Sequence, residues 1–330
     1  MIPYLLALCL NLCLALAASR TSAPSGALVV SKAPAKGQYS KIQDAVNALS
    51  TSSTTAQSIF IEAGTYNEQI YIAPRKAALT IYGYSENTDD YSQNVVTITQ
   101  KLSLNEVATD DLTATLRAWS TNFKLYNVNL ANTYGQGKQA LALNAAAANQ
   151  GYYACKFLGY QDTILAQIGT QLFAKSYIEG ATDFIFGQHG LAWFSYCDIR
   201  VLAASLGFVT ASGRASTEAG YYVLDHCSIA AKSGASVPKG AYYLGRPWGD
   251  YARVAVQYTT ISNVVNAAGW HVWSTSEPNT DHVSFGEYGN TGDGAAGTRV
   301  IGTKLSKAVA ITDVLGSDYA SAWYVDKAYL

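Results

Sequence analysis

The segments Cys155-Lys-Phe-Leu-Gly159 and Ser176-Tyr-Ile-Glu-Gly180 decide how this chain folds. Both place apolar or small residues at every second position, as a strand with one buried face requires. The segments start 21 residues apart, and an aspartate follows each first residue by seven positions, at Asp162 and Asp183. A short repeat of this length is typical of one turn of a β-solenoid.

The repeat predicts that the two aspartates lie side by side. Neighbouring parallel strands hold equivalent residues about 4.8 Å apart. Two carboxyl groups at that separation cannot both ionise freely, which suits them to acid, base or nucleophile roles. An aspartate at the end of a strand is also frequently a simple turn residue, so the pairing carries this hypothesis.

The same pattern extends in both directions along the chain. We align further copies at Val128–Asn132, Cys197–Val201, Cys227–Ala231 and Thr259–Asn263, and earlier ones at Ile59–Ala63 and Leu79–Gly83. A two-sheet antiparallel sandwich also has many short strands, but it predicts tight hairpins, and Asn-Gly or Asp-Gly pairs are few here. The pattern therefore favours an all-β parallel β-helix. Residues 42–49 have helical spacing after Ser40, a candidate N-cap, and are expected to cap the N-terminal end of the stack.

Composition limits the function and the location of the chain. The net charge is −1 with 14% charged residues and no basic patch, so nucleic acid is not an expected partner. Residues 1–18, MIPYLLALCLNLCLALAA, are predicted to be a secretory signal peptide cleaved near Ala17 or Ala18. A membrane anchor is the alternative, but the run barely reaches the needed length and lacks a basic flank. We expect one secreted domain, residues 19–330, with no membrane partner.

Three cysteines occupy the same position of the repeat: Cys155, Cys197 and Cys227. Cys155 and Cys197 would lie two turns apart with Ser176 between them, which is beyond the reach of a disulfide. We therefore expect an interior stack of free thiols. A metal site is not expected, because a linear stack cannot supply tetrahedral ligands.

Several blocks in the chain together identify a family resemblance. They are Gly64-Thr-Tyr-Asn-Glu68, Gln139-Ala-Leu-Ala-Leu143, Gly159-Tyr-Gln-Asp-Thr163, Asp183-Phe-Ile-Phe-Gly187, Leu244-Gly-Arg-Pro-Trp248 and Gly269-Trp-His-Val-Trp273. Their identity and order resemble the pectin methylesterases, from about Gln38 to Trp323, in a short form like that of fungal or bacterial members. The resemblance implies a right-handed single-stranded parallel β-helix, monomeric and without a cofactor or metal. It would hydrolyse the methyl esters of homogalacturonan in plant cell-wall pectin and release methanol.

The resemblance also implies roles for individual residues. Asp183 would attack the ester carbonyl, and Asp162 would give a proton to methanol and later take one from water. Gln139 and Gln161 would donate hydrogen bonds to the oxyanion, and Arg246 would orient Asp183 and keep it ionised. The expected sugar-binding residues are Trp248 and, in addition, Tyr160, Phe184 and Trp273.

Two other functions fit a solenoid with paired aspartates. A polygalacturonase-like hydrolase would cut the glycosidic bond, with its carboxyl groups roughly 6.5–9.5 Å apart if it inverts configuration. The second alternative is a non-catalytic solenoid, either a pectin-binding module or a family member that recognises another ester. The tight 21-residue register and the order of the blocks favour the esterase. A serine esterase is not predicted, because the Gly-x-Ser-x-Gly elbow is absent from the sequence.

Overall fold

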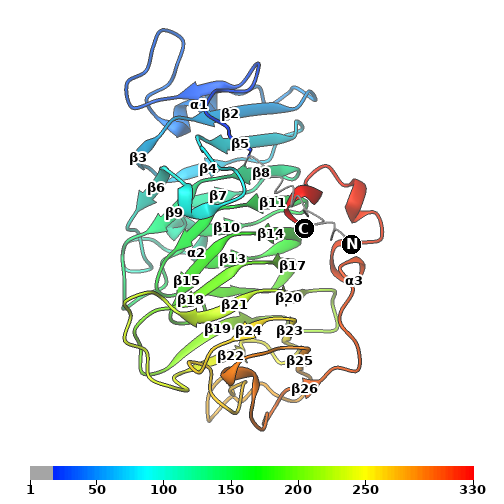
Figure 1. Ribbon diagram of the computed structural model, residues 1–330. Coiled ribbons are helices and arrows are strands. Elements are labelled where there is room, and N and C mark those ends of the chain that lie inside the picture. The colour runs from blue at the N-terminus through cyan, green and yellow to red at the C-terminus, as the bar shows by residue number, and fades with distance from the viewer. Residues whose placement is uncertain (1–17) are drawn as a thin grey trace, which may run out of the picture.

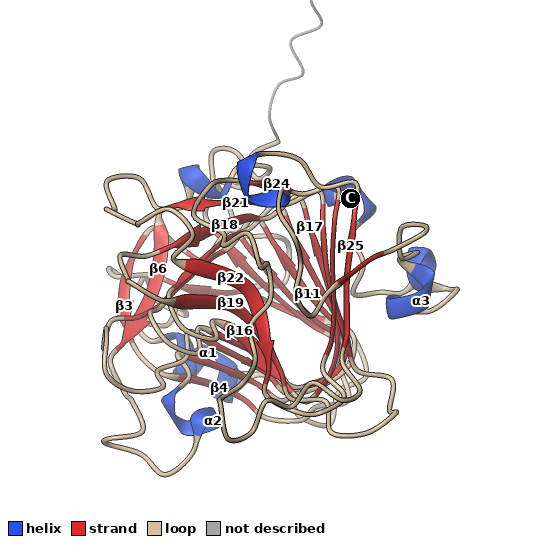
Figure 2. Ribbon diagram, turned by 90° about the horizontal axis from the view of Figure 1, so that it is seen from below, coloured by secondary structure: helices blue, strands red, loops and turns tan. Residues whose placement is uncertain are grey.

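A computed structural model of the chain describes residues 18–330. Their strands stack along one axis and form three parallel sheets around it (Figure 1). The chain passes through the three sheets in succession and then climbs by one strand, so each turn adds a strand to every side. Figure 2, a view along the axis, shows the sheets enclosing a common interior. This is the right-handed parallel β-helix that the sequence predicted. The expected signal peptide falls on residues 1–17, outside the described residues, and on Ala18.

The three sheets have 11, 8 and 7 strands. The eleven-stranded sheet contains β1 (Leu28–Val30), β2 (Gln57–Ile61), β5 (Leu79–Gly83), β8 (Phe123–Tyr126), β11 (Gln150–Tyr153), β14 (Ile168–Ala174), β17 (His189–Ser195), β20 (Tyr221–Asp225), β23 (Arg253–Gln257), β25 (Ser284–Tyr288) and β26 (Thr303–Lys304). The eight-stranded sheet contains β3 (Gly64–Asn67), β6 (Val96–Gln100), β9 (Asn129–Asn132), β12 (Lys156–Leu158), β15 (Tyr177–Gly180), β18 (Asp198–Val201), β21 (Ser228–Ala231) and β24 (Thr260–Ile261). The seven-stranded sheet contains β4 (Ile70–Ile72), β7 (Leu116–Ala118), β10 (Leu143–Ala145), β13 (Ile164–Ala166), β16 (Ile185–Gly187), β19 (Gly207–Ser212) and β22 (Tyr242–Pro247).

Short helices and 3-10 turns lie outside the sheets. They are α1 (Ile42–Ala48), α2 (Asp110–Thr113), α3 (Thr312–Leu315), η1 (Tyr91–Gln93), η2 (Asp293–Ala295), η3 (Tyr319–Ser321) and η4 (Lys327–Tyr329). None of the helices between residues 18 and 330 has the length and apolar content needed to cross a bilayer.

The 21-residue register is confirmed by the pairing of β12 with β15. Phe157 pairs with Ile178 in parallel, so residues 155–159 and 176–180 lie on neighbouring strands. Two of the aligned copies, however, were placed on the wrong side of the solenoid. β2 and β5 belong to the eleven-stranded sheet, whereas β9 is preceded in its own sheet by β6, which pairs with β3. Alternating apolar residues occur on all three sides, so the period alone does not distinguish the sheets.

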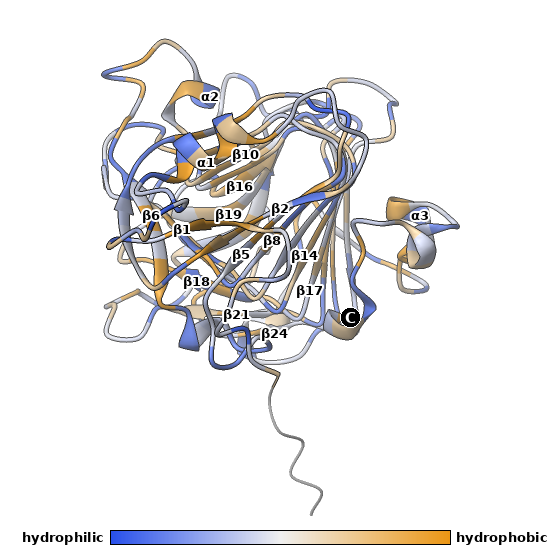
Figure 3. Ribbon diagram, turned by 90° about the horizontal axis from the view of Figure 1, so that it is seen from above, coloured by the Kyte–Doolittle hydropathy of each residue, from blue (hydrophilic) through white to orange (hydrophobic). Residues whose placement is uncertain are grey.

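The interior is filled by columns of identical or similar side chains. Phe173 stacks on Tyr152 at 4.7 Å between ring centroids and on Phe194 at 4.6 Å, because their strands are in register. Figure 3 shows hydrophobic residues concentrated on the strands around the interior. Cys155, Cys197 and Cys227 are buried and free, as predicted. The Cys155 amide donates to Ser176 Oγ at 3.1 Å, which links consecutive turns of that column.

The corner that leads into the eight-stranded sheet is a single residue with positive φ. It is Ala154 before Cys155, Lys175 before Ser176 and Tyr196 before Cys197. One left-handed residue turns the chain sharply and lets the next side chain point inward. Because the same bend recurs from the turn of Asn127 to that of Tyr258, the strands after it begin at the same level.

The N-terminal end of the stack is covered by α1, as predicted, with Ile42 and Val46 buried. The predicted cap by Ser40 is wrong. The amides of Ile42 and Gln43 instead donate to Oε1 and Oε2 of Glu68, at 3.0 and 3.1 Å. Glu68 follows β3, so a carboxylate distant in sequence satisfies the free amides of the helix and complements its dipole.

The C-terminal segment runs back along the outer face of the eleven-stranded sheet, and Figure 1 shows it in red beside the strands. The Asp326 amide donates to Tyr153 Oη at 2.8 Å. Tyr329 Oη donates to the Thr88 carbonyl at 3.0 Å. Parallel sheets are usually covered on both faces. The C-terminal segment covers the outer face of this sheet and so keeps its apolar side chains away from solvent.

Phe173→Ala should lower the free energy of unfolding by about 3–4 kcal/mol, because it removes the middle ring of the stack and leaves a cavity. Urea unfolding followed by tryptophan fluorescence measures the loss. The matched control is Ile168→Ala in the same strand, whose side chain is 45% exposed and should change stability little. Equal losses for both variants would contradict the assignment of the stability to the inner column.

Candidate active site

Asp162 and Asp183 lie on consecutive corners between the eight- and seven-stranded sheets. Asp162 connects β12 to β13, and Asp183 connects β15 to β16. Gln161 forms a parallel bridge with Thr182, and the Asp162 amide donates to the Thr182 carbonyl at 3.1 Å. Both aspartates have positive φ, 62° and 52°, a conformation that aspartate tolerates better than most residues. The predicted side-by-side placement is confirmed at the level of the backbone.

Each of the two corners begins with a glycine, and the residue four positions later folds back against that glycine. A Cβ on Gly180 would lie 2.2 Å from Cβ of Phe184, because the Phe184 ring folds back beneath that glycine. Phe184 is therefore 0% exposed and belongs to the central core. Its predicted place in the sugar-binding groove is wrong. The side chain instead packs under the corner that presents Asp183.

Arg246 reaches the pair from β22, three strands further along the seven-stranded sheet than β13. Its Nε donates to Asp183 Oδ1 at 2.9 Å and its Nη2 to Asp183 Oδ2 at 2.6 Å. The guanidinium lies between the rings of Phe208 and Trp273, 4.1 and 4.2 Å from their centroids. The two rings fix the plane of the guanidinium, so the two-pronged contact with Asp183 is held in place.

A cavity of about 250 Å³ opens over this pair on the outer face of the seven-stranded sheet. It is lined by Asp110, Gln139, Gln161, Asp162, Asp183, Phe186, Ala211, Arg246, Trp248 and Trp273. Gln139 and Gln161 lie on neighbouring corners, since the Ala140 amide donates to the Gln161 carbonyl at 3.2 Å. The structure thus brings both glutamines to the two aspartates. Each aspartate is only 6% exposed.

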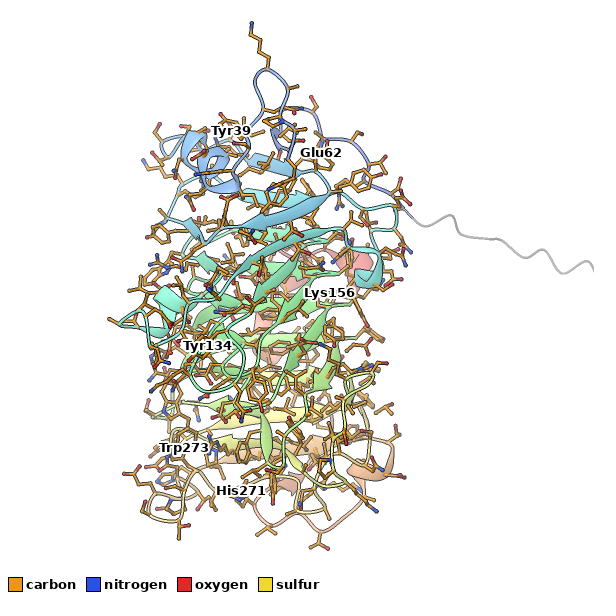
Figure 4. The ribbon with its side chains drawn as sticks, turned by 90° about the vertical axis from the view of Figure 1, so that its left-hand side faces the viewer. Tyr39, Glu62, Tyr134, Lys156, His271 and Trp273 are labelled. Atoms are coloured by element: carbon orange, nitrogen blue, oxygen red, sulfur yellow. The ribbon has the colours of Figure 1, made fainter. Side chains whose placement is uncertain are left out.

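The predicted sugar-binding aromatics divide between two hollows. Trp248 and Trp273 line the cavity with the aspartates, and Trp248 lies 6.2 Å from the ring of Phe186. Trp273 lies in the C-terminal half of the solenoid, as Figure 4 shows. Tyr160 lines a second cavity of about 330 Å³, which shares Gln161 with the first. An aromatic ring beside each hollow gives a sugar a flat apolar face to pack on.

The surroundings of the two carboxyl groups differ although their backbones match. Burial raises the pKa of Asp162 well above its ordinary value, and the negative charges of Asp183 and Asp110 raise it further, against the opposing charge of Arg246. Burial also raises the pKa of Asp183, but there the hydrogen bonds and charge of Arg246 oppose the rise directly. When the pair carries one proton, that proton therefore resides on Asp162 and the negative charge on Asp183.

Sequence reasoning missed three residues of this site. Phe208 packs on Arg246, Phe186 forms part of the cavity floor, and Asp110 lines the cavity from α2. Phe186 lies within the Asp183–Gly187 block, and its alternation with the inward Ile185 could have indicated an outward ring. Asp110 lies in the long loop between β6 and β7, whose position depends on tertiary contacts.

Known proteins share this fold, and curated sequences match the chain closely. The family model described as Pectinesterase matches residues 27–325. Pectinesterases of Aspergillus aculeatus and Aspergillus niger are 54% and 51% identical over 100% of both chains. The crystal structure of a pectin methylesterase from Aspergillus niger has a TM-score of 0.87 at 41% identity, covering 94% of this chain and 100% of that chain. The pectin methylesterase from carrot has a TM-score of 0.82 at 29% identity, covering 92% and 98%.

Fold, site and relatives together define a carboxylic ester hydrolase built on a parallel β-helix. The bond it hydrolyses is the methyl ester of pectin. The chain belongs to the pectinesterase family.

Asp162→Asn should stabilise the protein at neutral pH. The folded-state pKa of Asp162 is raised, so as the pH rises above the ordinary carboxyl value of 3.8 the carboxyl ionises in the unfolded chain before it does in the fold, and the folded state loses stability. Asparagine cannot ionise, and it also tolerates positive φ. The melting temperature should rise by a few degrees at pH 7, and the gain should vanish near about pH 3, where the aspartate is protonated in both states.

The matched control for that experiment is Asp111→Asn, which should have the opposite sign. Burial alone would raise the pKa of Asp111, but hydrogen bonds from Arg117, Trp119 and Asn144 lower it overall. Its contribution to stability is therefore present above the unfolded-state pKa and is lost as the pH falls through the folded-state pKa. A melting temperature of Asp162→Asn that is equal to or below that of the wild type at pH 7 would contradict the raised pKa.

Proposed function

We propose that Asp183 is the nucleophile and Asp162 the acid and base of pectin methyl ester hydrolysis in this enzyme. The observation that carries the proposal is the two-pronged contact of Arg246 with Asp183 alone. It keeps one carboxyl group ionised and turned toward the cavity. The other carboxyl, buried beside a negative charge, retains its proton. Two equivalent aspartates thereby acquire the two different protonation states that the reaction needs.

In the first half-reaction, a carboxylate oxygen of Asp183 attacks the ester carbonyl carbon of a methyl galacturonate unit. The side-chain amides of Gln139 and Gln161 line the cavity and donate hydrogen bonds to the oxyanion that forms. The carbon–methoxy bond then breaks, and the proton of Asp162 goes to the departing oxygen, so methanol leaves. The product of this step is an anhydride between Asp183 and the galacturonate carboxyl.

In the second half-reaction, water attacks the galacturonate carbonyl carbon of the anhydride. Asp162, now ionised, takes a proton from that water, and the bond to Asp183 breaks. Asp183 returns to its contact with Arg246, and Asp162 is again protonated. The free galacturonate carboxyl loses its proton to solvent. Only carboxylate, amide and guanidinium groups take part, so we expect chelators to leave turnover unchanged.

The sugar chain would lie across the two hollows, with Trp248 and Trp273 against one unit and Tyr160 beside another. We further propose that the enzyme is secreted and acts on the pectin of plant cell walls. The apolar residues 1–18 and a polysaccharide substrate that occurs outside cells support this location.

Arg246→Lys should reduce methanol release by about a hundredfold, because one ammonium cannot reproduce a planar fork of donors. The pKa of Asp183 should rise when the fork is lost, so the acidic limb of the pH–rate profile should move to higher pH. A matched control is Arg299→Lys, which alters a similar two-pronged pair with Glu287 (2.7 and 2.9 Å) outside the cavity. An unshifted acidic limb in Arg246→Lys would refute the role given to the arginine.

Asp183→Asn should abolish methanol release while keeping the fold and the affinity for methylesterified oligogalacturonide, because only the nucleophile is lost. Methanol and new reducing ends are measured together on methylated pectin. Wild-type enzyme should produce methanol alone, and new reducing ends would indicate glycosidic hydrolysis instead. Retention of more than about a few per cent of wild-type turnover would mean that another group attacks the ester.

A further inference from the structure

A third carboxyl group, that of Asp110, lines the cavity that holds Asp162 and Asp183. Asp110 is the first residue of α2, in the loop between β6 and β7. Its Oδ1 is buried and has no hydrogen-bond partner among residues 18–330. A buried carboxylate oxygen without a donor is costly to a folded protein, so its persistence beside a binding cavity points to a donor on the ligand.

The neighbouring residue, Asp111, anchors the segment of backbone that carries Asp110. Oδ2 of Asp111 accepts hydrogen bonds from Arg117 Nε and Nη2, at 3.0 and 2.6 Å. Its Oδ1 accepts from Trp119 Nε1 at 2.8 Å and from Asn144 Nδ2 at 2.7 Å. Four hydrogen bonds thus fix α2 to β7 and β10. Both carboxylate oxygens of Asp111 are engaged in these contacts, whereas Asp110, one residue earlier in α2, lines the cavity.

The order of the corners places Asp110 at a defined end of the cavity. In the seven-stranded sheet β7 lies on the N-terminal side of β10, β13 and β16, and β22 on their C-terminal side. Asp110 therefore limits the cavity on one side and Arg246 on the other, with both aspartates between them. A ligand bound at the two aspartates therefore has the carboxylate of Asp110 at one end and the guanidinium of Arg246 at the other.

The chemistry of the substrate decides what Asp110 can bind. The ester and ring oxygens of a methyl galacturonate unit only accept hydrogen bonds, and its ring hydroxyls are the donors. We propose that Asp110 is a further substrate-binding residue, whose carboxylate accepts a hydrogen bond from a ring hydroxyl and so selects units with free hydroxyl groups. This inference rests on the function proposed for the cavity. O-acetylation replaces the donor with an acceptor and places it against a negative charge, so acetylated units are excluded.

Asp110 also acts on the proton of Asp162. The charged groups that bear on Asp162 are Asp183, Asp110 and Arg246, of which the two aspartates favour its protonated form. Loss of the charge on Asp110 lowers the pKa of Asp162. Since Asp162 must carry a proton to release methanol, the alkaline limb of the pH–rate profile moves to lower pH. A residue that served only to hold the loop would not produce this shift.

The test measures binding in the inactive Asp183→Asn background, so it does not depend on turnover. Calorimetry compares a methylesterified oligogalacturonide with the same oligosaccharide after chemical O-acetylation. Adding Asp110→Ala should weaken binding of the free-hydroxyl ligand about tenfold and reduce the preference for it over the acetylated one. Asp110→Asn, of equal size, keeps an acceptor oxygen without the charge and should lie between. Asp44→Asn removes a charge from the exposed face of α1 and serves as the control.

The outcomes separate this inference from the proposed function. In the otherwise wild-type enzyme, Asp110→Asn should raise KM more than it lowers kcat and should shift the alkaline limb to lower pH. If the wild type released no methanol, the proposed reaction would fail, and the calorimetric comparison would still decide the role of Asp110. Equal affinities and equal discrimination with and without Asp110 would overturn the inference, whatever the turnover.

Discussion

Parallel, in-register stacking of consecutive turns is the constraint on which the rest of this structure depends. Hydrogen bonds between equivalent strands keep each turn at one strand spacing from the next. Features that recur in the sequence therefore become columns in space: aromatic rings, buried thiols, left-handed corner residues and, on two adjacent corners, aspartates. Burying two carboxyl groups at such a separation would be prohibitive on flexible loops. It is sustained here because the backbone on both sides is fixed by the ladder, so neither corner can relax without breaking strand pairing.

The site is costly to the fold, and its cost is offset by the column of core residues beneath it. The raised pKa values of Asp162 and Asp183 both report stability given up at neutral pH. Arg246 recovers part of it for Asp183 alone. Buried ion pairs of this kind seldom add net stability, because desolvation cancels most of the attraction. The arginine makes the electrostatic surroundings of Asp183 different from those of Asp162, although the two corners otherwise match.

Features that depend on neighbouring residues could be predicted from the sequence, whereas features that depend on tertiary contacts could not. The alternation in residues 155–159 and 176–180 is a property of neighbouring residues, and it predicted the strands, their register and the pairing of the aspartates correctly. The side of the solenoid to which a strand belongs depends on the whole turn and not on neighbouring residues, so β2 and β5 were assigned to the wrong sheet.

The prediction for Phe184 was wrong for a related reason. Its position directly after Asp183 suggested a groove residue, but the fold of the corner turns the ring under Gly180 and into the core. Glu68 and Asp110 act across tens of residues on a helix terminus and on the cavity, and no spacing rule connects them to their targets.

The different roles that we propose for the two aspartates depend on such long-range contacts. Each arises from one copy of a repeat, with the same corner geometry and the same exposure, so the repeat alone makes them interchangeable. The symmetry is broken by long-range elements on either side: β22, which carries Arg246 to Asp183, and α2, which places a further negative charge near Asp162. The long loop that contains α2 interrupts the short spacing of the repeat, and β22 begins after another such interruption. In this solenoid the regular turns build a pair of equivalent carboxyl groups, and the irregular insertions give the two groups different electrostatic surroundings.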